Sequence, residues 1–125
     1  MRTFKTKWLA KFTKKENISD KSLKAALTDA RNGLIDADYG GGLIKQRVAR
    51  EGEGKSGGYR MILVYRQDEL AIFLFGFAKS DKANLTTDEV TSYKEAAKLW
   101  LKASTNQLDA AKDAGELKEI KDDKD

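Results

Sequence analysis

The sequence Gly54-Lys55-Ser56-Gly57-Gly58-Tyr59-Arg60 is a glycine-rich turn that carries a lysine and leads into the most strand-like part of the chain, residues 59–66. Glycine allows positive φ angles and lets another backbone or a phosphate come close. Lys55 on the turn and Arg60 at the start of the strand place two cations at one end of a predicted sheet. Such a pair suits a polyanion better than a small apolar ligand.

The Gly-Lys-Ser part of this turn is not a nucleotide-binding P-loop. That motif requires a glycine five positions before Gly54, where the chain has Ala49. It also requires a helix after Ser56, so that the N–H groups of the helix N-terminus hold the phosphate. β-Branched and aromatic residues follow instead and favour a strand.

The composition excludes several kinds of active site. The chain has 125 residues, which predicts one domain with a modest core, and it has no cysteine and no histidine. Disulfides, thiolate nucleophiles, most zinc sites and the usual near-neutral proton carrier are therefore excluded, and no cofactor or metal is expected. The first five residues lack an apolar signal region, and no apolar run reaches membrane-spanning length. We expect a cytoplasmic protein without membrane contact.

The charge is distributed unevenly along the chain. Residues 1–104 contain 20 lysines and arginines against 13 acids, a net charge of +7. Residues 105–125 contain 4 lysines against 7 acids, a net charge of −3. A basic body is typical of a protein that binds nucleic acid, although exposed lysines on helices can also serve only to solvate the surface.

Hydrophobic periodicity predicts the N-terminal elements. Trp8 and Phe12 share a face with Leu9 at helical spacing, so we place both aromatic side chains in the core. Ser19 is an N-cap candidate, and Gly33 is a helix stop. The expected elements are an edge strand over residues 2–5, a basic helix over 7–15 and a second helix that ends near 33.

The rest of the body predicts a sheet and a third helix. Three antiparallel strands are expected over residues 43–48, 59–66 and 70–78, the last being apolar on both faces and therefore central. Thr86 and Glu89 form a capping box for a helix that runs to about residue 104. The fold class is α+β, with two N-terminal helices, a curled antiparallel sheet and a C-terminal helix. We expect the helices on one face and the cations on the other, which is left open. The domain spans residues 1–104, and residues 105–125 form a solvated helix or a frayed acidic tail.

Basic residues far apart in the sequence are expected to meet on this sheet, because adjacent antiparallel strands bring them together. They are Lys45, Arg47, Lys55, Arg60 and Lys79. A phosphate backbone would neutralise their mutual repulsion, and a merely solvated sheet face is the alternative. RNA supplies its own nucleophile, the 2′-OH, so such a site needs only to orient it and stabilise the charged phosphorane. The general base stays open between a lysine of lowered pKa, Glu51, Glu53 and Tyr59.

Three segments resemble the HigB-like branch of the RelE/ParE toxin superfamily of type II toxin–antitoxin systems. They are residues 41–50 (GGLIKQRVAR), residues 52–60 (GEGKSGGYR) and residues 75–84 (FGFAKSDKAN). The resemblance runs from about Arg2 to Ser104. It implies a microbial-ribonuclease-like fold and a hydrolase that cuts mRNA on the ribosome, an mRNA interferase that inhibits translation. It also implies a cognate antitoxin, often a helix-turn-helix protein.

The resemblance also implies roles for individual residues. Arg60 matches the strand arginine that contacts the scissile phosphate, and Lys79 matches the basic residue after the last strand. Ser80 and Thr86 depart from the family pattern, which often has an arginine and a catalytic tyrosine near these positions. The catalytic candidates are Arg60, Lys55 and Lys79, and the RNA-binding candidates are Lys45, Arg47, Arg50, Tyr59 and Lys82. A gyrase-poisoning toxin of the ParE type and a non-catalytic RNA-binding module are the alternative functions.

Overall fold

The computed structural model describes residues 1–49 and 58–121. Within these ranges the elements are β1 (Arg2–Thr6), α1 (Lys7–Lys15), α2 (Asp20–Arg31), β2 (Ala37–Gly40), β3 (Leu43–Val48), β4 (Tyr59–Arg66), β5 (Leu70–Ala78), α3 (Thr87–Leu101), α4 (Thr105–Asp113) and β6 (Leu117–Glu119). The helices predicted over 7–15 and after Ser19, and all three central strands, are therefore confirmed. The domain is α+β, as the sequence predicts.

The strands form one sheet in the order β2-β3-β4-β5-β1-β6. Neighbouring strands are antiparallel except for β1 and β5, which pair in parallel, with Phe4 opposite Ile72. The expectation that β1 is an edge strand is wrong, because β6 pairs with its outer side. β5 is an interior strand, as its apolar character on both faces predicts.

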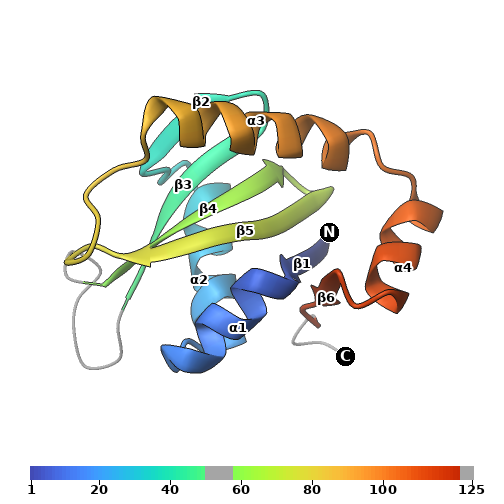
Figure 1. Ribbon diagram of the computed structural model, residues 1–125, viewed down its shortest axis with the longest axis horizontal. Helices are drawn as coiled ribbons and strands as arrows, with labels where there is room; N and C mark the ends of the chain where they lie inside the picture. The colour runs from blue at the N-terminus through green and yellow to red at the C-terminus, as the bar shows by residue number, and fades with distance from the viewer. Residues whose placement is uncertain (50–57, 122–125) are drawn as a thin grey trace.

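Helices cover both faces of the sheet (Figure 1). α1 and α2 pack on one face, where Leu9, Leu23 and Phe73 belong to one buried cluster. On the opposite face a second buried cluster joins Ile62 of β4 to Ala97 of α3. The expectation of one open face is therefore wrong. Its physical reason is that β4 and β5 present apolar side chains on both faces, and both sets have to be removed from water.

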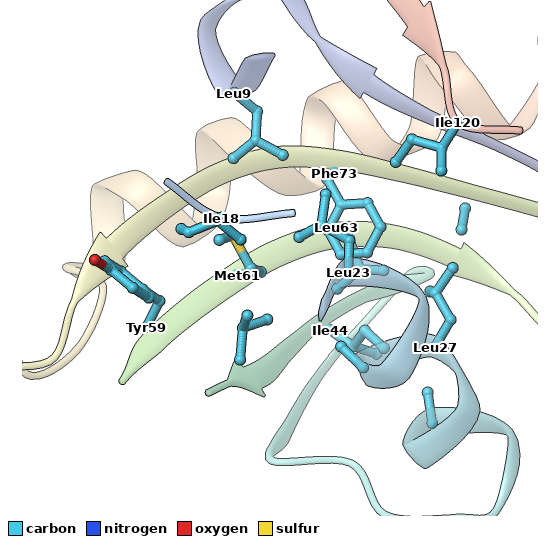
Figure 2. Close-up of a cluster of buried hydrophobic side chains, with 14 of the residues drawn as sticks. Leu9, Ile18, Leu23, Leu27, Ile44, Tyr59, Met61, Leu63, Phe73 and Ile120 are labelled. Carbon is cyan, nitrogen blue, oxygen red and sulfur yellow. The ribbon is translucent and has the colours of Figure 1, made fainter. Parts of the chain in front are cut away.

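The core under α1 and α2 contains several large, fully buried side chains (Figure 2). Leu23, Met61 and Phe73 are completely excluded from solvent. Each such side chain contributes about 1.5–3 kcal/mol through burial, and this cluster joins α2 to β3, β4 and β5. The basic residues of β3 and β4 are carried on the opposite face of the same strands.

Side-chain caps fix where the helices begin. The Ser19 hydroxyl accepts a hydrogen bond from the Ser22 backbone N–H, which confirms the predicted N-cap of α2. The predicted capping box of α3 is also present between Thr86 and Glu89. The capping box thereby fixes Thr87 as the first residue of α3.

The β2–β3 hairpin was not predicted. Its turn places Gly40, Gly41 and Gly42 at φ angles of 83°, 63° and 82°, which favours glycine at all three positions. A Cβ on Gly42 would lie 2.5 Å from the Leu101 side chain, so α3 also requires a glycine there. The hairpin matters for function because it places the residue just before β2 beside β3.

The aromatic residues of α1 are less buried than expected. Trp8 is 48% exposed, and Phe12 is only partly buried. The Trp8 ring stacks on Phe12 at 5.3 Å between centroids and contacts Phe75 at 4.6 Å. The core assignment of Trp8 is therefore wrong, because its indole packs on the partly buried rings of Phe12 and Phe75 and leaves about half of the residue in contact with solvent.

Residues 105–119 form α4 and β6. A helix was one of the two expected forms of this segment, but the pairing of β6 with β1 was not expected. Leu108 and Ala111 of α4 join the same buried cluster as Phe4. Across residues 1–49 and 58–121, no helix has the length and apolar character needed to cross a membrane.

Candidate nucleic-acid interface

Three predicted cations lie on one face of two neighbouring strands. In the β3–β4 register Arg47 is opposite Arg60, and Lys45 is opposite Ile62, one position along the same face. Like charges directly opposite each other in a sheet repel, so this arrangement needs a compensating anion. Lys45 and Arg60 are buried, with 9% and 5% of each residue exposed, whereas Arg47 is exposed.

The anion is Asp36, which immediately precedes β2. Its Oδ1 accepts a hydrogen bond of 2.9 Å from Arg47 Nε. Its Oδ2 lies 3.4 Å from Lys45 Nζ and 3.8 Å from Arg60 Nε. We call Lys45, Arg47, Arg60 and Asp36 the basic cluster. Three positive charges meet one negative charge there, so the basic cluster has a formal net charge of +2.

The electrostatics of the basic cluster keep Asp36 ionised. Burial by itself raises the pKa of this carboxyl, because the charged form loses water. The hydrogen bond from Arg47 and the charges of Lys45 and Arg47 lower it, and the balance is a pKa below the ordinary value. Asp36 is thus an anion throughout the neutral range and remains a permanent partner of the cations.

Two amide side chains hold the basic cluster in place. Gln46 is buried, and its Nε2 donates hydrogen bonds to the carbonyls of Ala26 and Leu34 at 2.9 and 3.0 Å. Its Oε1 accepts a 3.0 Å hydrogen bond from the Asp36 backbone N–H. Lys45 Nζ donates a 3.2 Å hydrogen bond to Asn84 Oδ1 from the β5–α3 connection. The cluster is therefore tied to α2, to β2 and to the segment before α3.

The other predicted site residues are placed differently. Lys79 is exposed and directly follows β5, and its backbone N–H donates to the Gly58 carbonyl at 3.1 Å, beside the start of β4. Lys82 forms a 2.7 Å ion pair with Glu89 of the α3 cap. Tyr59 is buried on the opposite face, where its hydroxyl donates to Glu16 at 3.2 Å, so it is not brought to the basic cluster. Arg50, Lys55 and the possible bases Glu51 and Glu53 lie outside the described residues.

This arrangement has a limited chemistry. Guanidinium and ammonium groups can hold a phosphate and stabilise the extra negative charge of a pentacoordinate phosphorane. In the part of the chain that the structure describes, no group of three or more acidic side chains is placed to hold a metal ion. The chemistry available from the described residues is therefore charge stabilisation and the orientation of an anion.

Sequence reasoning missed Asp36 and Asn84 as members of this site. A signal for Asp36 was present, because Gly40-Gly41-Gly42 is a turn signal, and a hairpin closed by it brings residues 36–38 beside β3. Asn84 carried no such signal, because it lies in an irregular connection whose path depends on how α3 packs. Both residues act by orienting cations that the sequence did identify.

The similarity to a known family extends over almost the whole chain. The model of a family described as RelE toxin of the RelE/RelB toxin–antitoxin system matches residues 1–120. The match includes α4 and β6, which lie beyond Ser104, where the sequence resemblance was expected to end. No curated protein matches the chain significantly. The chain therefore belongs to the RelE toxin family, whose members act as toxins of toxin–antitoxin systems and have an antitoxin as partner.

Proposed function

We propose that this toxin inhibits translation by cutting mRNA on the ribosome, and that it belongs to the HigB-like branch of the superfamily. The observation that supports this proposal is the basic cluster, in which three cations from two adjacent strands contact one carboxylate, so that cations outnumber acids among its described residues. A surplus of fixed, partly buried positive charge is suited to a phosphate backbone, which brings its own negative charges. Ribosome and mRNA are then the partners, and the cytoplasm is the place of action.

The proposed reaction uses the ribose of the message. The 2′-OH gives its proton to a general base and attacks the adjacent phosphorus, and the bond to the 5′-oxygen breaks as that oxygen takes up a proton, which leaves a 2′,3′-cyclic phosphate and a 5′-OH. The candidates for the base are a lysine of lowered pKa, Glu51 and Glu53. Arg60 and Arg47 stabilise the charge that develops on the non-bridging oxygens. Lys79, exposed beside the start of β4, supports the leaving oxygen, and Lys55 remains a catalytic candidate from the sequence. Lys45 and Lys82 contribute to the field that attracts the strand.

The antitoxin is proposed to be a helix-turn-helix protein. Its identity does not affect the reaction above, because the toxin alone carries the basic cluster. Co-purification of the toxin with the product of an adjacent gene tests this part. Recovery of a partner that lacks a DNA-binding helix-turn-helix would contradict the proposed antitoxin class without affecting the proposed cleavage.

The decisive experiment is cleavage of a translated message. Purified toxin is added to ribosomes programmed with a defined mRNA, and new 5′ ends are mapped by primer extension. We expect cuts spaced by codons that require the ribosome. Unchanged mRNA, together with inhibition of gyrase supercoiling by the same preparation, would instead assign the toxin to the gyrase-poisoning type. Binding of RNA without cleavage and without growth arrest would reduce it to an RNA-binding module.

A further inference from the structure

We propose that Asp36 is a positioning residue of the cleavage site. Its carboxylate holds Lys45, Arg47 and Arg60 in one arrangement, and at the same time it lowers the affinity for RNA that these cations would otherwise have. The inference rests on the proposed function, because it assigns Asp36 a role in the same site. In this role Asp36 weakens the binding of RNA and fixes the positions of the three cations.

The contacts of Asp36 determine which cationic atoms remain for a phosphate. Arg47 binds the carboxylate through Nε at 2.9 Å. An arginine held in this way keeps the N–H groups of its two terminal nitrogens for a second acceptor. The Arg47 side chain is 52% exposed, so a strand of RNA can reach it. Asp36 thus turns a flexible surface arginine into an oriented one.

The position of Asp36 is itself fixed. Its backbone N–H donates to the side-chain amide of Gln46, a residue that is 2% exposed. The same amide donates to carbonyls of α2 and of the segment after it. The backbone at Asp36 is therefore anchored, so that its carboxylate can reach only a limited region. An anchored anion limits where the arginine bound to it can be, which is the requirement for stabilising a transition state.

Removing the carboxylate is expected to change RNA affinity and cleavage rate in opposite directions. Without it the basic cluster gains one unit of positive charge, and two of its three cations are on side chains that are nearly buried. The attraction for RNA then rises, because one more positive charge faces the phosphates. The three cations also repel one another and lose their common partner, so their geometry relaxes. Tighter binding and slower cleavage should appear in the same variant.

The variant Asp36→Asn tests this prediction, because it keeps the shape of the side chain and removes its charge. We expect KM for ribosome-bound mRNA to fall and kcat to fall by about tenfold or more, as expected when reacting groups are misplaced. The affinity for a single-stranded RNA oligonucleotide should rise, and the slope of log K against log salt should steepen by about 0.7 for one added charge. Asp38→Asn is the matched control, because this variant removes the same charge two residues away. Asp38 is exposed, and its carboxylate accepts a hydrogen bond from the Gly40 N–H instead of contacting the cations.

Two outcomes would overturn the inference while the wild-type toxin cleaves mRNA. One is an unchanged kcat in Asp36→Asn, and the other is an RNA affinity that does not rise above that of Asp38→Asn. If Asp36→Asn fails to fold, Asp36→Glu carries the test, because it keeps the charge and moves the carboxylate by one methylene. It should retain the RNA affinity and lose kcat, and an unchanged kcat would again refute the positioning role. Absence of cleavage by the wild type is a different result, which refutes the proposed function.

Discussion

Two clusters of charged side chains lie in different parts of this sheet, and they differ in their charge balance. In the basic cluster three cations of β3 and β4 share one carboxylate. The second cluster joins β1, α4 and β6 and contains two cations and two acids: Arg2, Lys112, Asp109 and Glu119. The second has no formal net charge, whereas the first has a surplus of two positive charges.

We call the second cluster, formed by Arg2, Lys112, Asp109 and Glu119, the balanced cluster; its ion pairs stabilise the fold. Arg2 binds both carboxylate oxygens of Glu119 at 2.9 and 3.0 Å, and Lys112 binds the same carboxylate at 2.9 Å. The hydrogen bond from Arg2, together with that from Lys112, lowers the pKa of Glu119 to about 2 although partial burial opposes this. All four groups are satisfied by each other, and the result is that β6 is fastened to β1. Among the described residues of the basic cluster, cations outnumber acids, which is the difference from the balanced cluster.

Arg60→Ala is expected to have the largest effect on function. Arg60 is the most buried cation of the basic cluster and lies directly opposite Arg47. Loss of one preorganised charge at a transition state typically lowers the rate by about 10²–10³-fold. Cleavage of ribosome-bound mRNA should fall by that factor, and growth should recover when the variant is expressed.

Arg66→Ala is the matched control for Arg60→Ala. Arg66 lies at the other end of β4, is exposed and pairs with Glu69 at 3.3 Å. It should retain full toxicity. Equal loss of activity in both variants, or circular dichroism showing that Arg60→Ala is unfolded, would contradict the assignment of Arg60 to the cleavage site.

Glu119→Gln should affect stability rather than activity. The pKa of Glu119 is lowered from 4.5 to about 2 in the folded chain, so its ionised form stabilises the fold above pH 4.5 and this contribution is lost as the pH falls through 2. We expect the free energy of unfolding at pH 7 to fall by about 2 kcal/mol, allowing for the partial exposure of the pair. Urea unfolding at pH 7 and at pH 2.5 measures this, and the difference from wild type should shrink at the lower pH.

Glu116→Gln removes the same charge from an exposed neighbouring side chain and serves as the control. Its unfolding free energy should match that of the wild type at both pH values. A Glu119→Gln variant as stable as Glu116→Gln at pH 7 would mean that the balanced cluster does not fasten β6.

Local sequence was sufficient for much of the fold. β3, β4 and β5 follow from apolar runs bounded by glycines and polar turns, and α1 follows from helical spacing. β2 and β6 were not predicted, because strands of 4 and 3 residues contain too few positions to show alternation. Their existence depends on pairing with distant residues, as for Leu117 opposite Thr6. The second covered face was missed for a related reason, since helical periodicity does not show which face of the sheet a helix will cover.

Positions in the candidate site could be predicted where they follow from the alternation of side chains along a strand. Lys45 and Arg47 alternate along one strand, so their common face followed from the sequence. Placing Arg60 beside them required the β3–β4 register, and strand alternation also puts its neighbour Tyr59 on the other face. The anion of the basic cluster could not be found in this way, because Asp36 precedes an edge strand that was not recognised.

Lys79→Ala is expected to slow cleavage less than Arg60→Ala does. Lys79 is exposed at the end of β5, where water screens its charge and its long side chain is not preorganised. We expect cleavage of ribosome-bound mRNA to fall by about tenfold, the low end for loss of a group that assists the leaving oxygen. Lys118→Ala is the control, because Lys118 is an exposed lysine on β6, beside the balanced cluster. If both variants slow cleavage equally, overall charge rather than the location of Lys79 explains the effect, and the distinction between the two clusters would then not extend to exposed lysines.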